Sequence, residues 1–141
     1  MKKLLQPRPL PCNASLGLLL LRLVAGLAFA LHGWGKVQTP FGWAGDAFPG
    51  VLQGLAALSE FGGGIAWMLG LLTPLASFGI ACTMAVAVYF HAIKLGDPFV
   101  ASGPGQGAYE PASVYLCVAL LLLLAGPGRH SADRMLFGER S

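Results

Sequence analysis

The chain has 141 residues, of which 55% are hydrophobic and 11% are charged. A soluble domain usually carries about 25% charged residues, so this chain has too little charge to cover a water-exposed surface, and lipid must cover part of it. The net charge is +3, but most basic residues gather near the two chain ends without interleaved aromatic side chains, which argues against a nucleic-acid-binding protein.

Four apolar segments follow one another along the chain, each close to the roughly 20 residues that a spanning helix needs. The third starts just after Thr73-Pro74, and proline is well tolerated at a helix start. The fourth ends at Gly126-Pro127-Gly128, a strong stop signal. The predicted fold class is therefore all-α, an integral membrane four-helix bundle in one domain over 1–141. The predicted helices cover about 15–36, 52–72, 75–95 and 111–125.

The first segment also has features of a cleaved signal peptide, with a basic start and Ala28-Phe29-Ala30 as a cleavage site. However, the prolines at positions 7, 9 and 11 separate the basic start from the apolar run, and Arg22 interrupts that run. We therefore prefer a spanning helix for this segment.

The distribution of Lys and Arg predicts the orientation in the membrane, because positive residues favour the cytoplasmic side. Six of them lie in the two termini, whereas only Lys36 and Lys94 adjoin the long loops at about 37–51 and 96–110. Both termini are therefore predicted to be cytoplasmic, with the two long loops outside. The connection at Thr73-Pro74 is short, so the second and third helices are expected to form an antiparallel hairpin.

Charged groups in hydrocarbon are costly and usually face the interior of a bundle. Glu60 lies about 12 Å below the outer surface at a rise of about 1.5 Å per residue. His32, Lys36 and His91 lie near the outer ends of their helices, and Glu110 precedes the fourth helix. Five polar residues from all four helices are therefore predicted to converge on the outer half of the bundle.

Arg22 lies nearer the inner side, and two arrangements are open for it. It could reach toward Glu60 and form a buried ion pair, which would lower the cost of both charges. Alternatively, Arg22 extends to the inner headgroups, Lys36 extends outward, and Glu60 is protonated. Lys36 is a further possible partner for Glu60, and the sequence does not decide among these arrangements.

The outer polar residues suggest a site for a flat, apolar molecule such as a quinone, since histidine titrates near neutrality and could exchange protons with it. Alternatively, the histidines only form hydrogen bonds at the interface, and the aromatic residues belong to the interfacial belt. The residues predicted to exchange protons are Glu60, His91 and His32. The residues predicted to bind the quinone are Arg22, Lys36, Phe61, Trp67, Tyr89 and Glu110.

Other redox and metal motifs are missing from the sequence. The three cysteines form no CxxC, and the histidines and carboxylates form no HxxxH or ExxH spacing. This argues against a dithiol motif, a zinc finger or another metal site. No haem, flavin or iron–sulfur signature is present, so redox work would need a quinone or a partner protein.

Four groups of motifs in order resemble the DoxX family of bacterial membrane proteins, over roughly residues 15–135. They lie at 22–26 with 32–36, at 60–64 with 69–74, at 110–111, and at 126–133. The resemblance implies a multi-pass protein of the bacterial cytoplasmic (inner) membrane. It also implies a place in a quinone-linked oxidoreductase system with sulfur- or thiol-related chemistry, since namesake members resemble or form the membrane subunit of a thiosulfate:quinone oxidoreductase.

The chain lacks the soluble domain that a complete thiosulfate oxidoreductase would need, so catalysis by this chain alone stays open. The expected partners are the lipid bilayer, a membrane or periplasmic redox protein and further copies of the chain. The alternative function is a non-catalytic membrane subunit or assembly factor, whose polar residues form a structural network. A carrier with Glu60 as its proton site ranks last, because no internal repeat is visible.

Overall fold

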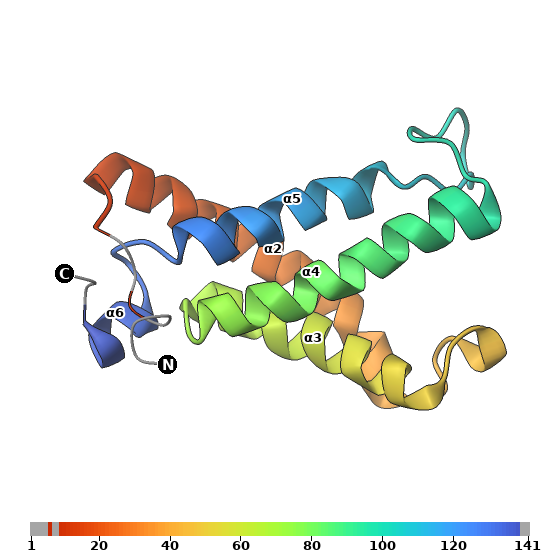
Figure 1. Cartoon of the computed structure of the whole chain (residues 1–141), viewed down its shortest axis with the longest axis horizontal. Helices are drawn as coiled ribbons and strands as arrows, with labels where there is room; N and C mark the ends of the chain where they lie inside the picture. Colours follow the sequence, from red (N-terminus) through yellow and green to blue (C-terminus); the bar gives the residue numbers. More distant parts are fainter. Residues whose placement is uncertain (1–5, 7–8, 139–141) are drawn as a thin grey trace.

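The computed structural model describes residue 6 and residues 9–138, and all regular structure in this part of the chain is helical (Figure 1). The all-α class predicted from the sequence is therefore confirmed. The elements in chain order are the α-helix α2 (Cys12–Gln38), the 3-10 helix η1 (Gly45–Ala47), α3 (Gly50–Leu69), α4 (Thr73–Tyr89), the π-helix η2 (Phe90–Leu95), α5 (Glu110–Ala125) and α6 (Ala132–Phe137).

The helix ends differ from the sequence-based boundaries where backbone geometry decides them. The second helix ends at Leu69 rather than about residue 72, because Gly70 adopts the left-handed conformation with φ +64°. The Leu71 amide then donates to the Ala66 carbonyl and closes the last turn. The last six residues of the predicted third helix form the π-helix, and the short helix α6 was not predicted.

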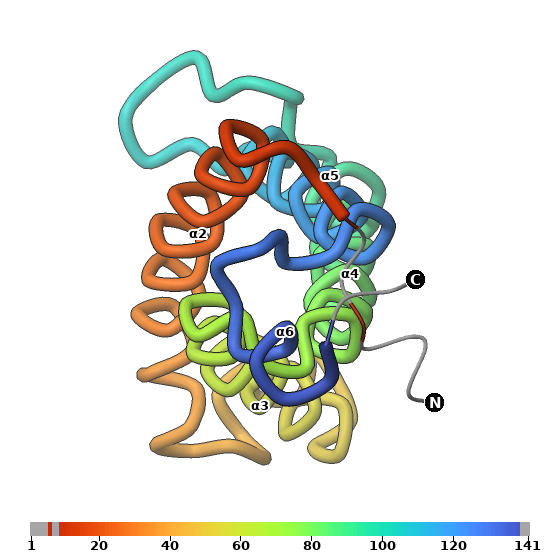
Figure 2. Tube along the Cα trace, turned by 90° about the vertical axis from the view of Figure 1, so that its left-hand side faces the viewer, coloured from red at the N-terminus to blue at the C-terminus, as the bar shows by residue number. Residues whose placement is uncertain are grey.

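The four long helices lie side by side in chain order (Figures 1 and 2), with α2 packed on α3, α3 on α4 and α4 on α5. The turn between α3 and α4 contains only 70–72, so these two helices form the expected hairpin. The core of the packed helices holds Phe29, Trp67, Ile80 and Leu122, which are almost fully buried. The Phe29 and Trp67 rings meet nearly at right angles, with 5.5 Å between their centroids.

Glycines bring the backbones of α2 and α3 together, as small residues do between membrane helices. A Cβ added at Gly26 would lie 2.6 Å from the Gly64 carbonyl oxygen, and one at Gly33 would overlap the backbone nitrogen of Phe61. The two helices therefore touch through their main chains at two levels.

Gly33→Ala is expected to lower the free energy of unfolding by about 1–3 kcal/mol, the usual cost of overpacking a close contact. Gly35→Ala is the matched control on the same helix, because a Cβ there meets nothing within 4 Å. Unfolding in detergent with increasing denaturant measures both variants. Equal stability of the two would contradict the close packing of α2 on α3.

The outside of the helices is strongly apolar. Val24, Leu58, Leu75 and Leu124, one on each long helix, are between 64% and 72% exposed. Exposed apolar side chains on all four helices are typical of a protein surrounded by lipid.

Within the described residues, two helices are long and apolar enough to span a membrane, Cys12–Gln38 and the continuous stretch Thr73–Leu95. Their most apolar windows are only 28% and 22% buried, unlike the core helix of a soluble protein. The apolar helix α5 has 16 residues and α3 does not meet the same criterion. The number of spans and the cytoplasmic position of the termini therefore stay predictions.

Candidate functional site

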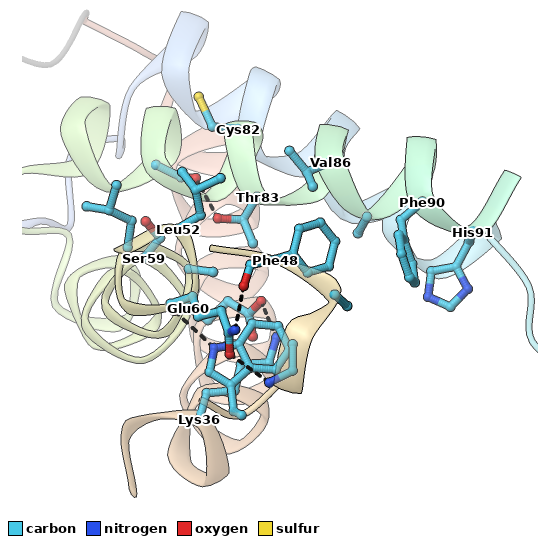
Figure 3. A pocket seen from close by; sticks show the side chains of 18 of the residues that line it. Lys36, Phe48, Leu52, Ser59, Glu60, Cys82, Thr83, Val86, Phe90 and His91 are labelled. Carbon is cyan, nitrogen blue, oxygen red and sulfur yellow. Dashed lines mark hydrogen bonds and ion pairs between the residues drawn. The ribbon is translucent and has the colours of Figure 1, made fainter. Parts of the chain in front are cut away.

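A cavity of about 690 Å³ lies between α3, α4 and the loop that joins α2 to α3. We call it the α3–α4 groove. Lys36, Glu60 and His91 are the predicted site residues that line it. Figure 3 shows Lys36 and Glu60 on the side away from α4, with Phe90 and His91 at one end.

The polar wall of the groove is an ion pair between helices α2 and α3. The Lys36 Nζ lies 2.6 Å from the Glu60 Oε1, and the Glu60 side chain is only 4% exposed. The same Nζ stands 4.2 Å from the centroid of the Trp43 ring, within the range of a cation–π contact. Because each charge has its partner at hydrogen-bond distance, the cost of burying the carboxylate is reduced.

Arg22 is not the partner of Glu60, and it does not extend to the headgroups either, so both arrangements drawn from the sequence were wrong for this residue. Its guanidinium is buried and donates to three main-chain carbonyls: to Trp67 at 3.0 Å, to His130 at 2.8 Å, and to Pro127. Carbonyls at the end of α3 and after α5 therefore satisfy this charge, which leaves Lys36 to pair with Glu60.

Gln53 holds the loop that forms one side of the groove, although it was not among the site residues predicted from the sequence. Its side chain is 2% exposed, accepts from the Ala44 amide at 2.7 Å, and donates to the Gly45 and Phe48 carbonyls at 2.8 Å each. The main-chain carbonyl of Gln53 accepts from the Trp43 indole at 3.0 Å. One signal was available: Gln53 is the only side-chain amide in the predicted second helix.

The remaining walls are apolar and partly open to the surroundings. The rings of Phe48 and Phe90 meet at 5.1 Å between centroids and close the end near His91. Leu55 and Phe78 line the groove and are 55% and 58% exposed. Thr83 adds little polarity, because its hydroxyl donates to the Gly79 carbonyl of its own helix. A ligand in the groove would therefore contact both the ion pair and the lipid phase.

His91 stands at the groove within the π-helix, and its Nδ1 lies 2.6 Å from Asp97 Oδ2. His32 does not join it, because it lies exposed on α2 and does not line the groove. Glu110 is the first residue of α5, where its amide donates to the Phe99 carbonyl, and it is also absent from the groove wall.

The predicted aromatic slot of Phe61, Trp67 and Tyr89 does not form. Trp67 is fully buried in the core, where its indole donates to the Ser77 hydroxyl at 2.9 Å. The Phe61 ring instead faces Trp34 at 5.6 Å, and Tyr89 is 53% exposed away from the groove. The aromatic residues at the groove are instead Trp43, Phe48, Phe78 and Phe90.

The C-terminal segment binds the helices at the end of the molecule opposite to the groove, where α6 lies over the ends of the long helices (Figure 2). Asp133 is fully buried, and its two oxygens accept from the amides of Leu72 at 2.6 Å and Thr73 at 2.8 Å, at the start of α4. Its amide donates to the Gly70 carbonyl at 2.9 Å. Ser131 caps α6 by accepting from the Arg134 amide. We call Arg22 and Asp133, with the carbonyls and amides they bind, the C-terminal clasp.

A model of the DoxX family matches residues 17–92, which is more than half of the chain. The chain is also similar to the inner membrane protein YqjF of Escherichia coli (strain K12). The two sequences are 33% identical over 128 residues, which cover 85% of this chain and 92% of that protein. No solved structure matches the chain.

Proposed function

Because the chain belongs to the DoxX family, we propose that it is a multi-pass inner membrane protein that binds a quinone in the α3–α4 groove, as a subunit of a membrane oxidoreductase system. The observation that carries this proposal is the Lys36–Glu60 pair, a half-buried cation and a buried carboxylate on the wall of an otherwise apolar groove.

The chemistry of the pair suits a quinone and its reduced form. The Lys36 ammonium has donors to spare for a carbonyl oxygen, since an ammonium group carries three. The Glu60 carboxylate has a second oxygen that can accept from a quinol hydroxyl. Charge-assisted hydrogen bonds of this kind are stronger than those between neutral groups. The electrons would come from a partner redox protein in the membrane or the periplasm.

The apolar walls support entry from the bilayer. The exposed side chains of Leu55 and Phe78 belong both to the groove wall and to the outer surface of the helices. A quinone dissolved in lipid could therefore place its ring beside the ion pair and leave its chain among these residues.

The test is binding of a short-chain quinone to the protein purified in mild detergent, followed by quenching of tryptophan fluorescence. Trp43 stands at the ion pair, so Trp34→Phe and Trp67→Phe leave a single reporter at the groove. Saturable quenching supports the proposal. A stoichiometric protein partner that co-purifies, with no quenching by quinone, would instead favour the non-catalytic subunit.

The proposed topology has four spans and both termini in the cytoplasm. Single cysteines near Ser102 and near Ser141, in a chain with Cys12, Cys82 and Cys117 replaced by serine, are expected to react differently with an impermeant thiol reagent on intact cells. Labelling near Ser102 alone supports the topology, and equal labelling at both positions excludes it.

A further inference from the structure

The segment after α4 turns in an unusual way at the groove. Helix α4 passes into the π-helix Phe90–Leu95, and short π-helical segments frequently occur at functional sites. Gly96 then adopts the left-handed conformation with φ +69°, and the Asp97 amide donates to the His91 carbonyl at 2.9 Å. This turn brings the side chain of Asp97 back beside the imidazole of His91.

The contact between these two side chains uses one specific nitrogen of the ring. The His91 Nδ1 lies 2.6 Å from the Asp97 Oδ2, and the two side chains are 37% and 19% exposed. Among the described residues, the other ring nitrogen, Nε2, has no hydrogen-bond partner. His91 lines the groove, so Nε2 is the ring nitrogen left for a ligand there.

We propose that Asp97 is a positioning residue, which holds the His91 ring through Nδ1 so that Nε2 is presented to a hydroxyl of the reduced quinone, the quinol, in the α3–α4 groove. The part of this proposal that concerns the ligand rests on the proposed function. A carboxylate that accepts from Nδ1–H fixes the tautomer in which Nε2 is the acceptor. Nε2 can then accept a hydrogen bond from a quinol hydroxyl at the end of the groove that Phe48 and Phe90 close.

The loop after the π-helix holds the Asp97 side chain in place. A Cβ added at Gly107 would lie 2.5 Å from the Asp97 Oδ2 and 2.8 Å from its carboxyl carbon. The main chain of the 96–110 loop therefore packs directly against the carboxyl group. Gly107→Ala should move this carboxyl group away from His91 without removing a charge.

The first measurement needs no ligand. The chain has three histidines, so ¹⁵N-labelled histidine gives few imidazole signals, and His91→Gln assigns the one of interest. We expect a protonated Nδ1 in the unaltered protein. Asp97→Ala and Gly107→Ala should both change the Nδ1 and Nε2 chemical shifts. Asp46→Ala, at an exposed acidic residue of the other outer loop, should leave them unchanged.

The second measurement is the affinity for the reduced short-chain quinone, the quinol, under anaerobic conditions, which should fall about tenfold in Asp97→Ala and in Gly107→Ala, as expected when a hydrogen bond to a ligand is lost. If the unaltered protein binds the quinol but Asp97→Ala keeps its affinity and its imidazole shifts, the positioning role is overturned and the proposed function stands. If the unaltered protein binds neither the quinone nor the quinol, the proposed function fails. The imidazole shifts then decide alone: unchanged shifts in Asp97→Ala overturn the positioning of His91, and changed shifts support it.

Discussion

Asp133→Ala is expected to lower the free energy of unfolding by about 2–3 kcal/mol. The substitution leaves the Leu72 and Thr73 amides without their acceptor at the buried start of α4. Loss of a helix cap costs about 1–2 kcal/mol, and hydrogen bonds to a charged group are worth about 1.5–3 kcal/mol. Asp133→Asn should cost less, because its amide oxygen can still accept one of the two bonds.

Arg22→Leu is expected to act on the same structure from the other side. It leaves the carbonyls of Trp67, Pro127 and His130 without the guanidinium that satisfies them. Because both residues hold the C-terminal segment in place, the double variant should be less destabilised than the sum of the two single ones. Denaturant unfolding in detergent measures all three variants, with Asp46→Ala as the control at an exposed carboxylate. Full stability of Asp133→Ala would show that α6 does not hold the α3–α4 turn.

Glu60→Gln is expected to reduce quinone affinity by tenfold or more while the protein still inserts and purifies normally. The amide keeps the shape of the side chain but removes the negative charge that orients Lys36 at 2.6 Å. A charge-assisted hydrogen bond is worth about 1.5–3 kcal/mol, which corresponds to at least a tenfold change in affinity. Quenching of the Trp43 fluorescence by the short-chain quinone is the measurement.

Two further variants make this result interpretable. Lys36→Met should also weaken quinone binding, because it removes the cation and leaves Glu60 buried without its partner. Glu110→Gln is the control, since this carboxylate lies at the start of α5 and does not line the groove. If Glu60→Gln binds the quinone as tightly as the unaltered protein does, the ion pair is structural. The non-catalytic membrane subunit would then be the better interpretation.

The sequence predicted the charged residues Lys36 and Glu60 of the α3–α4 groove, but not the aromatic residues that form its walls. Glu60 stood out because it is the only acidic residue deep within a predicted span, and its depth follows from helix rise alone. Trp67 lies seven residues later and nearly on the same face by helical periodicity. It is also about 10 Å further along the helix, where the Phe29 ring of α2 covers it. Periodicity predicts a shared face, but it does not predict which neighbouring helix covers that face at each level.

The groove and the clasp also depend on segments that have no periodic pattern. Trp43 and Phe48 lie in a loop rich in glycine, and the position of this loop depends on Gln53 rather than on hydrophobicity. Asp133 follows a proline and glycine stop signal, and its partner amides lie about 60 residues earlier in the chain. Pairings at such separation depend on how the helices pack, which one sequence does not reveal.

The C-terminal clasp joins residues that are synthesised at very different times, so it cannot form until late in translation. Arg22 lies in the first long helix, but two of its three acceptor carbonyls belong to residues 127 and 130, which the ribosome adds more than 100 residues later. Until then, a buried cation in the first helix lacks most of its acceptors, and the α3–α4 turn lacks the carboxylate of Asp133. Synthesis of all four long helices therefore precedes completion of the fold, and the nascent protein depends on the segment after α5 to satisfy a charge placed in α2.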